Sequence, residues 1–172
     1  MFKILATTAA LSLAAFSAQA ATIVVNGGFE VGPVGTGQNR NTFASMPGAS
    51  GIDSWDIYSS FPDWTLSDGE LEVQTRNTIP LDPFEGDYYA ELDGNRNNAI
   101  TQTVNLTVGR YTLSFAYSPR VNESGQPVNT NSINYSLGNL ASGLVTGPST
   151  TYPLGVWTVV TNNFTVRTAG SY

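Results

Sequence analysis

Two aromatic and two acidic residues lie close together between residues 53 and 58, and their side chains are of types that bind sugars. Trp55 and Tyr58 offer flat apolar rings that stack on the C–H face of a sugar. Asp53 and Asp56 accept hydrogen bonds from sugar hydroxyl groups. The run falls where we expect a loop, and binding residues are common on loops. These four residues therefore predict a sugar-binding platform; the alternative is that the rings fold back over the core.

A second polar group alternates along residues 87–93. Asp87, Tyr89, Glu91 and Asp93 would share one face of a strand, because side chains alternate between the two faces. Neighbours two positions apart lie about 7 Å from each other, which invites comparison with a pair of glycosidase carboxylates. A glycosidase, however, holds its acid and its base on opposite sides of the sugar bond, and one strand cannot do this. The stripe therefore predicts the outward face of a half-buried strand, and we expect no enzymatic activity.

The composition excludes several other kinds of site. The chain has no histidine and no cysteine, so it lacks the usual general base, the Ser–His and Cys–His nucleophile pairs and the usual zinc ligands. The formal net charge is −6, and eleven of the thirteen acidic residues lie between Asp53 and Asp93. This acidity argues against nucleic acid or an anionic membrane as a partner. It favours a cation or a polar ligand.

Residues 1–20 have the pattern of an export signal. Lys3 gives a positive start, residues 4–16 are apolar or small, and Ala18-Gln19-Ala20 supplies the small residues that signal peptidase requires. We expect cleavage after Ala20, a single domain over residues 21–172, and a secreted or cell-surface protein. No later stretch reaches the ~18 apolar residues of a membrane helix, so we expect no transmembrane segment after the signal is removed.

The rest of the chain is rich in Gly, Pro, Thr, Ser, Asn, Val and Tyr, which is typical of an all-β protein with many turns. No stretch after the signal shows the sustained 3.6-residue apolar period of a helix. Short strands joined by long loops predict an antiparallel β-sandwich or jelly roll. Strands are predicted at residues 22–25, 70–74, 87–93, 100–104, 110–117, 132–137 and 156–166, with loops at 32–51 and 118–131.

Several short segments, taken in order, resemble one family of exported proteins. They are residues 25–30 (VNGGFE), 63–65 (DWT), 71–74 (LEVQ), 85–94 (EGDYYAELDG), 100–104 (ITQTV), 109–117 (GRYTLSFAY), 157–158 (WT) and 164–166 (FTV). Their order and spacing are similar to those of the bacterial choice-of-anchor proteins. Many of those proteins carry PEP-CTERM sorting tails, and they are similar to the plant family called domain of unknown function 642. The resemblance covers nearly all of the chain after the signal except residues 32–56.

The resemblance implies a galactose-binding-like β-sandwich of the kind found in many carbohydrate-binding modules. It places Trp64 and Trp157 in the core, and it implies a structural Ca²⁺ ion held by Glu30, backbone carbonyls and an aspartate of the final strand. Calcium takes six to eight such oxygen ligands. The family's last strand carries an Asp-Asn-Val or Asp-Asp-Val run, which this sequence does not show before Tyr172. We therefore expect a fragment or a shortened member that lacks the last strand, with weak or absent calcium binding.

Together these observations predict an exported, non-catalytic module that binds a polysaccharide or the extracellular matrix by stacking and hydrogen bonding. The alternative is a structural or adhesive surface protein that binds other proteins, or itself, through an open sheet edge. A third possibility, a hydrolase, would depend on Glu91 or Asp93.

Overall fold

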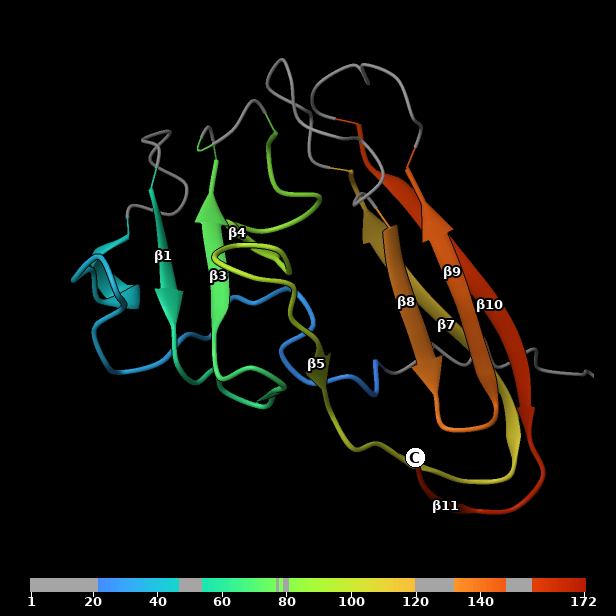
Figure 1. Ribbon diagram of the computed structural model, residues 1–172. Coiled ribbons are helices and arrows are strands. Elements are labelled where there is room, and N and C mark those ends of the chain that lie inside the picture. The colour runs from blue at the N-terminus through green and yellow to red at the C-terminus, as the bar shows by residue number, and fades with distance from the viewer. Residues whose placement is uncertain (1–21, 47–53, 77, 79–80, 120–131, 148–155) are drawn as a thin grey trace, which may run out of the picture.

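A computed structural model describes residues 22–46, 54–76, 78, 81–119, 132–147 and 156–172 (Figure 1). These residues form short strands with one 3₁₀ turn, η1 (Phe43–Ser45), and no helix among them is long and apolar enough to cross a membrane. All strand pairings are antiparallel, so the predicted all-β class is confirmed. The strands are β1 (Trp55–Tyr58), β2 (Thr65–Leu66), β3 (Leu71–Thr75), β4 (Tyr88–Glu91), β5 (Ile100–Thr101), β6 (Asn105–Leu106), β7 (Gly109–Tyr117), β8 (Ser132–Leu137), β9 (Ala141–Thr146), β10 (Thr158–Val166) and β11 (Gly170–Ser171).

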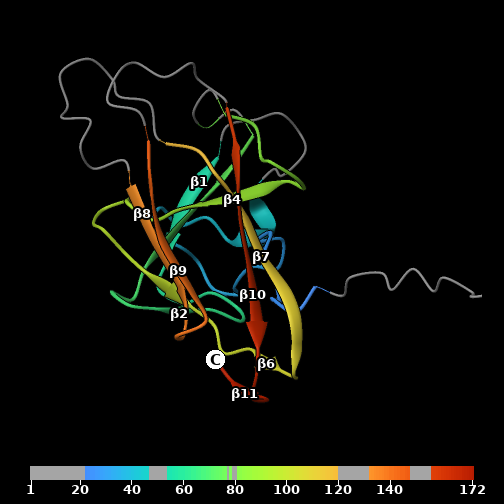
Figure 2. The same cartoon turned by 90° about the vertical axis from the view of Figure 1, so that its right-hand side faces the viewer.

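The strands are arranged in layers. A three-stranded sheet has the order β1–β3–β4, and the longest pairings elsewhere are β7 with β10 and β8 with β9. Figures 1 and 2 show the three-stranded sheet beside these two pairs. Phe115 of β7 meets Tyr135 of β8 edge to face, with ring centroids 5.1 Å apart, and Asn162 of β10 donates to the Tyr135 hydroxyl at 3.3 Å. The β8–β9 pair therefore packs on the β7–β10 pair, as in a sandwich.

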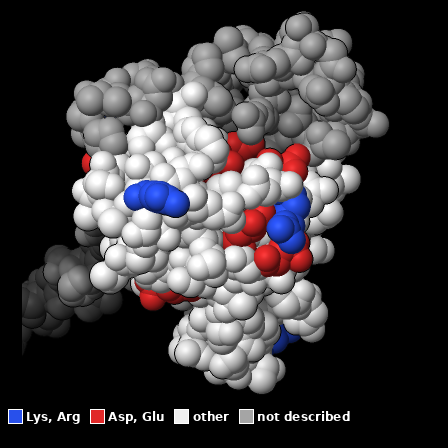
Figure 3. Space-filling model, turned by 60° about the vertical axis from the view of Figure 1, so that its left-hand side comes forward, with Lys and Arg blue, Asp and Glu red and all other residues white. Residues whose placement is uncertain are grey.

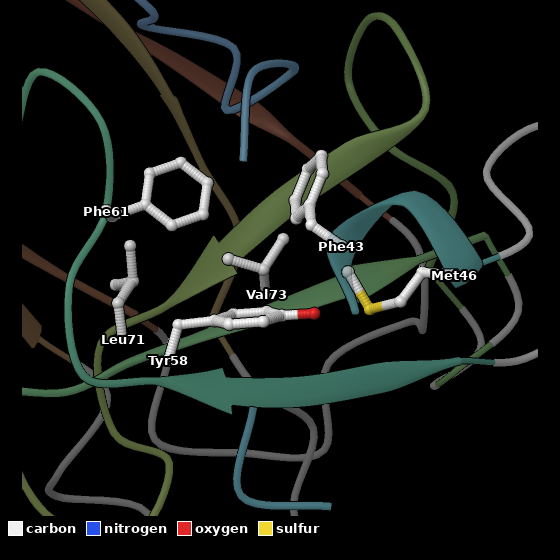
Figure 4. Packing of buried hydrophobic residues seen from close by; sticks show 6 residues of the cluster. All are labelled: Phe43, Met46, Tyr58, Phe61, Leu71 and Val73. Carbon is white, nitrogen blue, oxygen red and sulfur yellow. The ribbon is translucent and has the colours of Figure 1, made fainter. Parts of the chain in front are cut away.

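The main hydrophobic core lies against one face of the three-stranded sheet. Leu71 and Val73 of β3 are fully buried there (Figure 4). Tyr88, Ala90 and Leu92 pack against the same cluster, so the predicted alternation of residues 87–93 is confirmed for its apolar face. β3 is the central strand, with β1 and β4 on either side, and it is buried along its whole length. The central residues of the core are Phe43, Met46, Tyr58, Phe61, Leu71 and Val73.

A second, smaller hydrophobic core lies between β6, β7, β10 and the C-terminal residue Tyr172. Val104, Leu106 and Val166 are buried in it, and the rings of Tyr111 and Phe164 stack with centroids 5.6 Å apart. The chain end is fastened here, because Val104 and Tyr172 exchange two backbone hydrogen bonds of 2.9 Å each. The short pair β6–β11 continues this ladder.

The strand predicted at residues 22–25 is wrong, because this segment runs into a turn instead. The side chain of Gln102 takes the place of a strand neighbour. Its Oε1 accepts from the Val25 N–H at 2.8 Å, and its Nε2 donates to the carbonyls of Val25 (2.9 Å) and Asp63 (2.8 Å). One amide side chain therefore satisfies both backbone groups of Val25, and no partner strand is needed.

Five strands were missed by the alternation argument: β1, β9 and the two-residue strands β2, β6 and β11. β1 lies in the segment 54–58, at the end of the expected loop, and β9 contains Ser142 and Gly143, which weaken its apolar pattern. A turn at Gly138, whose φ of +49° suits glycine, lets β9 fold back on β8. The predicted strand at 100–104 is present only in part, as β5.

Asn26 fixes the turn between the chain start and the core. It adopts a left-handed φ of +50°, which asparagine tolerates better than most residues. Its Oδ1 accepts from the Val31 N–H at 3.0 Å, and its Nδ2 donates to the carbonyls of Val31 (2.7 Å) and Pro62 (3.2 Å). Its own carbonyl accepts from the Trp64 indole at 3.1 Å. Trp64 stacks on Phe29 and is partly buried against the core, so the core position that the resemblance implied for it is only partly realised.

Candidate functional site

The structure does not bring the four residues of the predicted platform together. Asp53 lies outside the described residues. Trp55 begins β1 with 41% of its surface exposed, whereas Asp56 and Tyr58 point to the opposite face of the strand and are buried. Since the stretch is a strand and not a loop, alternation separates the two rings. Trp55 is therefore the one platform residue that the structure presents to solvent.

Asp56 has a structural task. Its carboxylate is fully buried and accepts three backbone hydrogen bonds, from Asn39 (2.8 Å) and Ile57 (2.7 Å) on Oδ1 and from Asn41 (2.9 Å) on Oδ2. Gly37 passes so close that a Cβ at that position would collide with the carboxylate. Asp56 thus shapes the loop of residues 37–41 and holds it against β1.

Tyr58 is a core residue, and this corrects the prediction that its ring stacks on a sugar. Only 2% of its surface is exposed, and Figure 4 shows its hydroxyl pointing toward Met46. No group in the described ranges forms a hydrogen bond with this hydroxyl. Burial, with the nearby Asp56 carboxylate and the Tyr88 hydroxyl, raises the pKa of Tyr58 to about 12. The hydroxyl therefore stays neutral across the physiological range.

Replacing Tyr58 with phenylalanine is expected to raise the free energy of unfolding at pH 7 by about 1 kcal/mol, because it removes a buried hydroxyl that lacks a partner. In the wild type, stability should also fall between pH 10 and pH 12, since the unfolded chain loses the Tyr58 proton first. Tyr58→Phe should reduce this alkaline loss. Urea denaturation at pH 7 and at pH 11 measures both effects.

Tyr111→Phe is the matched control, because the Tyr111 hydroxyl donates to the Thr107 carbonyl at 3.0 Å. That variant should lose stability at pH 7. If Tyr58→Phe lost as much as Tyr111→Phe, the Tyr58 hydroxyl would have to be well paired in the folded protein.

Glu30, the predicted calcium ligand, caps the start of β4. Its Oε1 accepts from the backbone N–H groups of Asp87 (3.0 Å) and Tyr88 (3.2 Å). Gly86 has a φ of +68° and passes so close that a Cβ there would collide with the same oxygen. Burial, then the carboxylates of Asp87 and Glu30, raises the pKa of Tyr88.

The fit of Glu30 to calcium is limited by these bonds. One carboxylate oxygen is already occupied by two N–H donors, which leaves Oε2 to face a cation. No group of three or more His, Cys, Asp or Glu side chains able to hold a metal occurs within the described parts of the chain. Any ion at Glu30 would therefore depend on backbone carbonyls for most of its ligands.

Glu30→Ala is expected to lower the free energy of unfolding by about 1–3 kcal/mol, because two N–H groups lose a charged acceptor. The loss should be equal with added calcium and with a chelator, measured by urea denaturation. Glu85→Ala, an exposed neighbour, serves as the control and should change little. A loss seen only in calcium would contradict the capping role and support Glu30 as a metal ligand.

The opposite face of the three-stranded sheet is polar. Residues directly opposite each other in antiparallel strands point to the same face, so the register places side chains from three strands side by side. We call it the polar face; four of its residues are buried, Trp55 is exposed and Glu91 is half-buried. The polar face consists of two cross-strand rows, Trp55–Gln74–Tyr89 and Ile57–Glu72–Glu91.

A hydrogen-bonded network occupies the middle of the polar face. The Gln74 Nε2 donates to Glu72 Oε1 at 2.7 Å and also to Glu91 Oε2, and its Oε1 accepts from the Tyr89 hydroxyl at 2.8 Å. Gln74 and Tyr89 are buried and Glu91 is half-buried. The prediction that the polar residues of 87–93 form the outward face of the strand is therefore wrong for Tyr89, which is buried.

The facing pair Glu72 and Glu91 was missed because it depends on the register between β3 and β4. Its signal in the sequence is the alternation of Glu70, Glu72 and Gln74 with apolar residues, which shows a polar face but not its partner. Glu72 is buried and Glu91 is half-buried, so of this pair only Glu91 reaches the surface, where a carboxylate can accept hydrogen bonds from a polar ligand.

Beside this network, four residues from three segments form a cluster that we call the Glu70 cluster. Gln38 donates from Nε2 to Glu70 Oε2 (3.2 Å) and accepts on Oε1 from Asn95 (3.0 Å), while Arg96 Nε lies 3.2 Å from Glu70 Oε1. The Glu70 side chain is buried and that of Arg96 is 61% exposed. Figure 3 shows acidic side chains gathered on the surface with a basic side chain against them. The Glu70 cluster holds the turn of residues 93–97 against the part of the polar face that contains Glu72.

An aromatic cluster borders the polar face on the β4 side. Trp157 meets Tyr89 edge to face at 5.9 Å and Phe84 at 6.3 Å, and its indole N–H donates to the Asp82 carbonyl at 2.7 Å. Trp157 is half-buried and Phe84 is 52% exposed. The core position that the resemblance implied for Trp157 is therefore only partly realised.

Similarity to known proteins gives no guide to the function of this chain. No protein family, curated protein or solved structure that was compared with this chain matches it. The case for function therefore depends on the polar face, the Glu70 cluster and the aromatic residues at the borders of the sheet.

Proposed function

We propose that this protein is a non-catalytic module that binds carbohydrate at the surface around Trp55, at the β1 border of the polar face. The observation that carries the proposal is the position of Trp55: an exposed indole in the same cross-strand row as Gln74 and Tyr89. An exposed indole of this kind can stack on the C–H face of a sugar.

The charge of the surface favours an uncharged polysaccharide. The chain has a net charge of −6, and three carboxylates, those of Glu70, Glu72 and Glu91, lie in or beside the polar face. Glu70 and Glu72 are buried and Glu91 is half-buried. Their negative charge repels sugars that carry carboxylate or sulfate groups. Glu72 and Glu91 share one amide donor on one face of the sheet, which supports binding over hydrolysis because hydrolysis needs two carboxylates on opposite sides of the bond.

Trp55→Ala is expected to weaken binding to a neutral polysaccharide about tenfold or more, because an aromatic anchor of this kind contributes roughly 2 kcal/mol. A glycan array of neutral plant and bacterial polysaccharides would identify a ligand, and calorimetry would then give the affinity of each variant. Trp55→Phe should keep part of the affinity, since it keeps a smaller ring.

Leu144→Ala is the control, because Leu144 is an exposed large apolar residue on β9, away from the polar face. It should bind as the wild type does. Binding to no saccharide by the folded protein would overturn the proposal. Concentration-dependent assembly in size-exclusion chromatography, without glycan, would instead favour an adhesive surface protein.

Export through residues 1–20, the family resemblance and the calcium ion at Glu30 remain predictions. The binding proposal does not depend on any of them, because its residues all lie on the described strands and turns. If the export prediction holds, the ligand would be met at the cell surface or in the extracellular matrix.

A further inference from the structure

An exposed aromatic ring, Phe84, lies close to an exposed ion pair outside the polar face. Phe84 is 52% exposed, and its ring meets the half-buried ring of Trp157 with centroids 6.3 Å apart. The Asp82 carboxylate lies 3.1 Å from Nη1 of Arg76, and the two side chains are 59% and 38% exposed. Two residues of extended chain span at most about 7 Å, so Asp82 and Phe84 lie within the reach of one small ligand.

These groups are held in place from beneath. Trp157 contacts the buried ring of Tyr89 edge to face at 5.9 Å, and it supports Phe84 from the other side of the contact. The Trp157 indole N–H donates to the Asp82 carbonyl at 2.7 Å. Asp82 is thus held on its backbone by Trp157 and on its carboxylate by Arg76. Groups that are fixed before a ligand arrives lose little conformational entropy when it binds.

The exposed groups match the contacts that a neutral sugar makes. An aromatic ring can stack on the C–H face of a sugar. The Asp82 carboxylate accepts hydrogen bonds and the Arg76 guanidinium donates them, so together they can bind hydroxyl groups on adjacent carbon atoms. An apolar ligand would take this ion pair out of water and give nothing in return. Glu85 and Asp87 follow Phe84 in the chain, and their charge disfavours an anionic sugar.

This group of residues is separate from the surface around Trp55. Trp55 lies on β1, whereas Trp157 contacts Tyr89 on β4, at the other side of the three-stranded sheet. Two strand spacings, roughly 10 Å, separate the backbone of Trp55 from that of Tyr89. Gln74 and Tyr89 are buried, so the two surfaces are divided by side chains that a ligand does not reach.

We infer that Phe84, Asp82 and Arg76 form a second carbohydrate site, which binds one or two units of a neutral sugar independently of Trp55. The inference goes beyond the proposed function, which places one site around Trp55, and rests on it only for the class of ligand. Two separate sites allow one molecule to bind a polysaccharide at two places, which strengthens its attachment without any further contact.

Indole N–H signals in two-dimensional NMR spectra report on the two sites separately, because Trp157 contacts Phe84 and Trp55 marks the other site. The Trp157 signal is assigned by its absence in Trp157→Phe. On titration with the disaccharide of a neutral polysaccharide that a glycan array has identified, both indole signals should shift in the wild type. Phe84→Ala should raise the dissociation constant obtained from the Trp157 signal about tenfold or more and leave that from the Trp55 signal unchanged. Trp55→Ala should leave the response of Trp157 unchanged.

Asp82→Ala is a second variant of the same site. It keeps the backbone carbonyl that holds Trp157 and removes only the carboxylate, so it should weaken the response of Trp157 about fivefold. Leu144→Ala is the control and should leave both responses unchanged. Circular dichroism checks that each variant folds, and Asp82→Ala decides if Phe84→Ala does not.

The outcomes separate the two proposals. A Trp157 signal that does not shift, that loses its shift in Trp55→Ala, or that responds fully in Phe84→Ala and Asp82→Ala overturns the inference and leaves the proposed function standing. A shift of the Trp157 signal without one of the Trp55 signal supports the second site and overturns the site around Trp55. Binding of no saccharide at all overturns both.

Discussion

Replacing Asp56 with alanine is expected to lower the free energy of unfolding by about 3–5 kcal/mol. The carboxylate is fully buried and accepts hydrogen bonds from the N–H groups of Asn39, Asn41 and Ile57. Hydrogen bonds to charged groups contribute about 1.5–3 kcal/mol each, and the donors that remain would be left without an acceptor. Urea denaturation followed by circular dichroism measures the loss.

Two further variants make this prediction specific. Asp56→Asn keeps one acceptor oxygen and should lose less stability than Asp56→Ala. Asp68→Ala removes an exposed carboxylate and should change stability by no more than about 0.5 kcal/mol. Gly37→Ala should resemble Asp56→Ala, since its Cβ would collide with the carboxylate. If Asp56→Ala cost less than about 1 kcal/mol, the loop of residues 37–41 would not depend on this side chain.

Replacing Gln74 with glutamate is expected to lower the free energy of unfolding at pH 7 by about 3 kcal/mol or more. The amide now donates to both Glu72 and Glu91, and a carboxylate in its place would face two others in a buried position. The loss should shrink at acidic pH, because protonation of one of the three carboxyl groups removes the repulsion and supplies a donor. Urea denaturation at pH 7 and at pH 4.5 measures this difference.

Gln74→Met is the matched neutral control. It removes the same hydrogen bonds with a side chain of similar size, so it should lose about 1–3 kcal/mol without introducing charge. Its loss should therefore change less between the two pH values than that of Gln74→Glu. Equal stability of Gln74→Glu and Gln74→Met at pH 7 would contradict the arrangement, because it would mean that the two glutamates do not face position 74.

The fold class could be predicted from the sequence wherever apolar residues alternate strongly. β7 is the clearest case, since Tyr111, Leu113 and Phe115 share one face of a strand that the structure places at Gly109–Tyr117. β3 and β4 were found in the same way. β9 was missed because its alternation includes a glycine, and the segment 22–25 was read as a strand although its partner is the side chain of Gln102.

The candidate site could be predicted only in part, because most of it depends on strand register and on loops that meet through space. Trp55 was recognised, but Tyr58 was assigned to the same platform because the stretch was read as a loop, in which alternation does not apply. The facing of Glu72 and Glu91 follows from the pairing of β3 with β4, which no local pattern reveals. The Glu70–Arg96 contact joins residues in separate turns, and neither residue signals the other.

The bonds of Asn26 also bear on how this protein ages. An asparagine followed by glycine is prone to lose its side-chain ammonia, because the next backbone nitrogen attacks the side-chain carbonyl carbon. In the folded chain the Asn26 amide nitrogen is tied to Val31 and Pro62 and its oxygen to Val31, so the side chain is not free to rotate toward Gly27. A chain kept unfolded lacks this protection. Once converted to an acid, position 26 would present a carboxylate to two carbonyl oxygens, so time spent unfolded would gradually erode the capacity to refold.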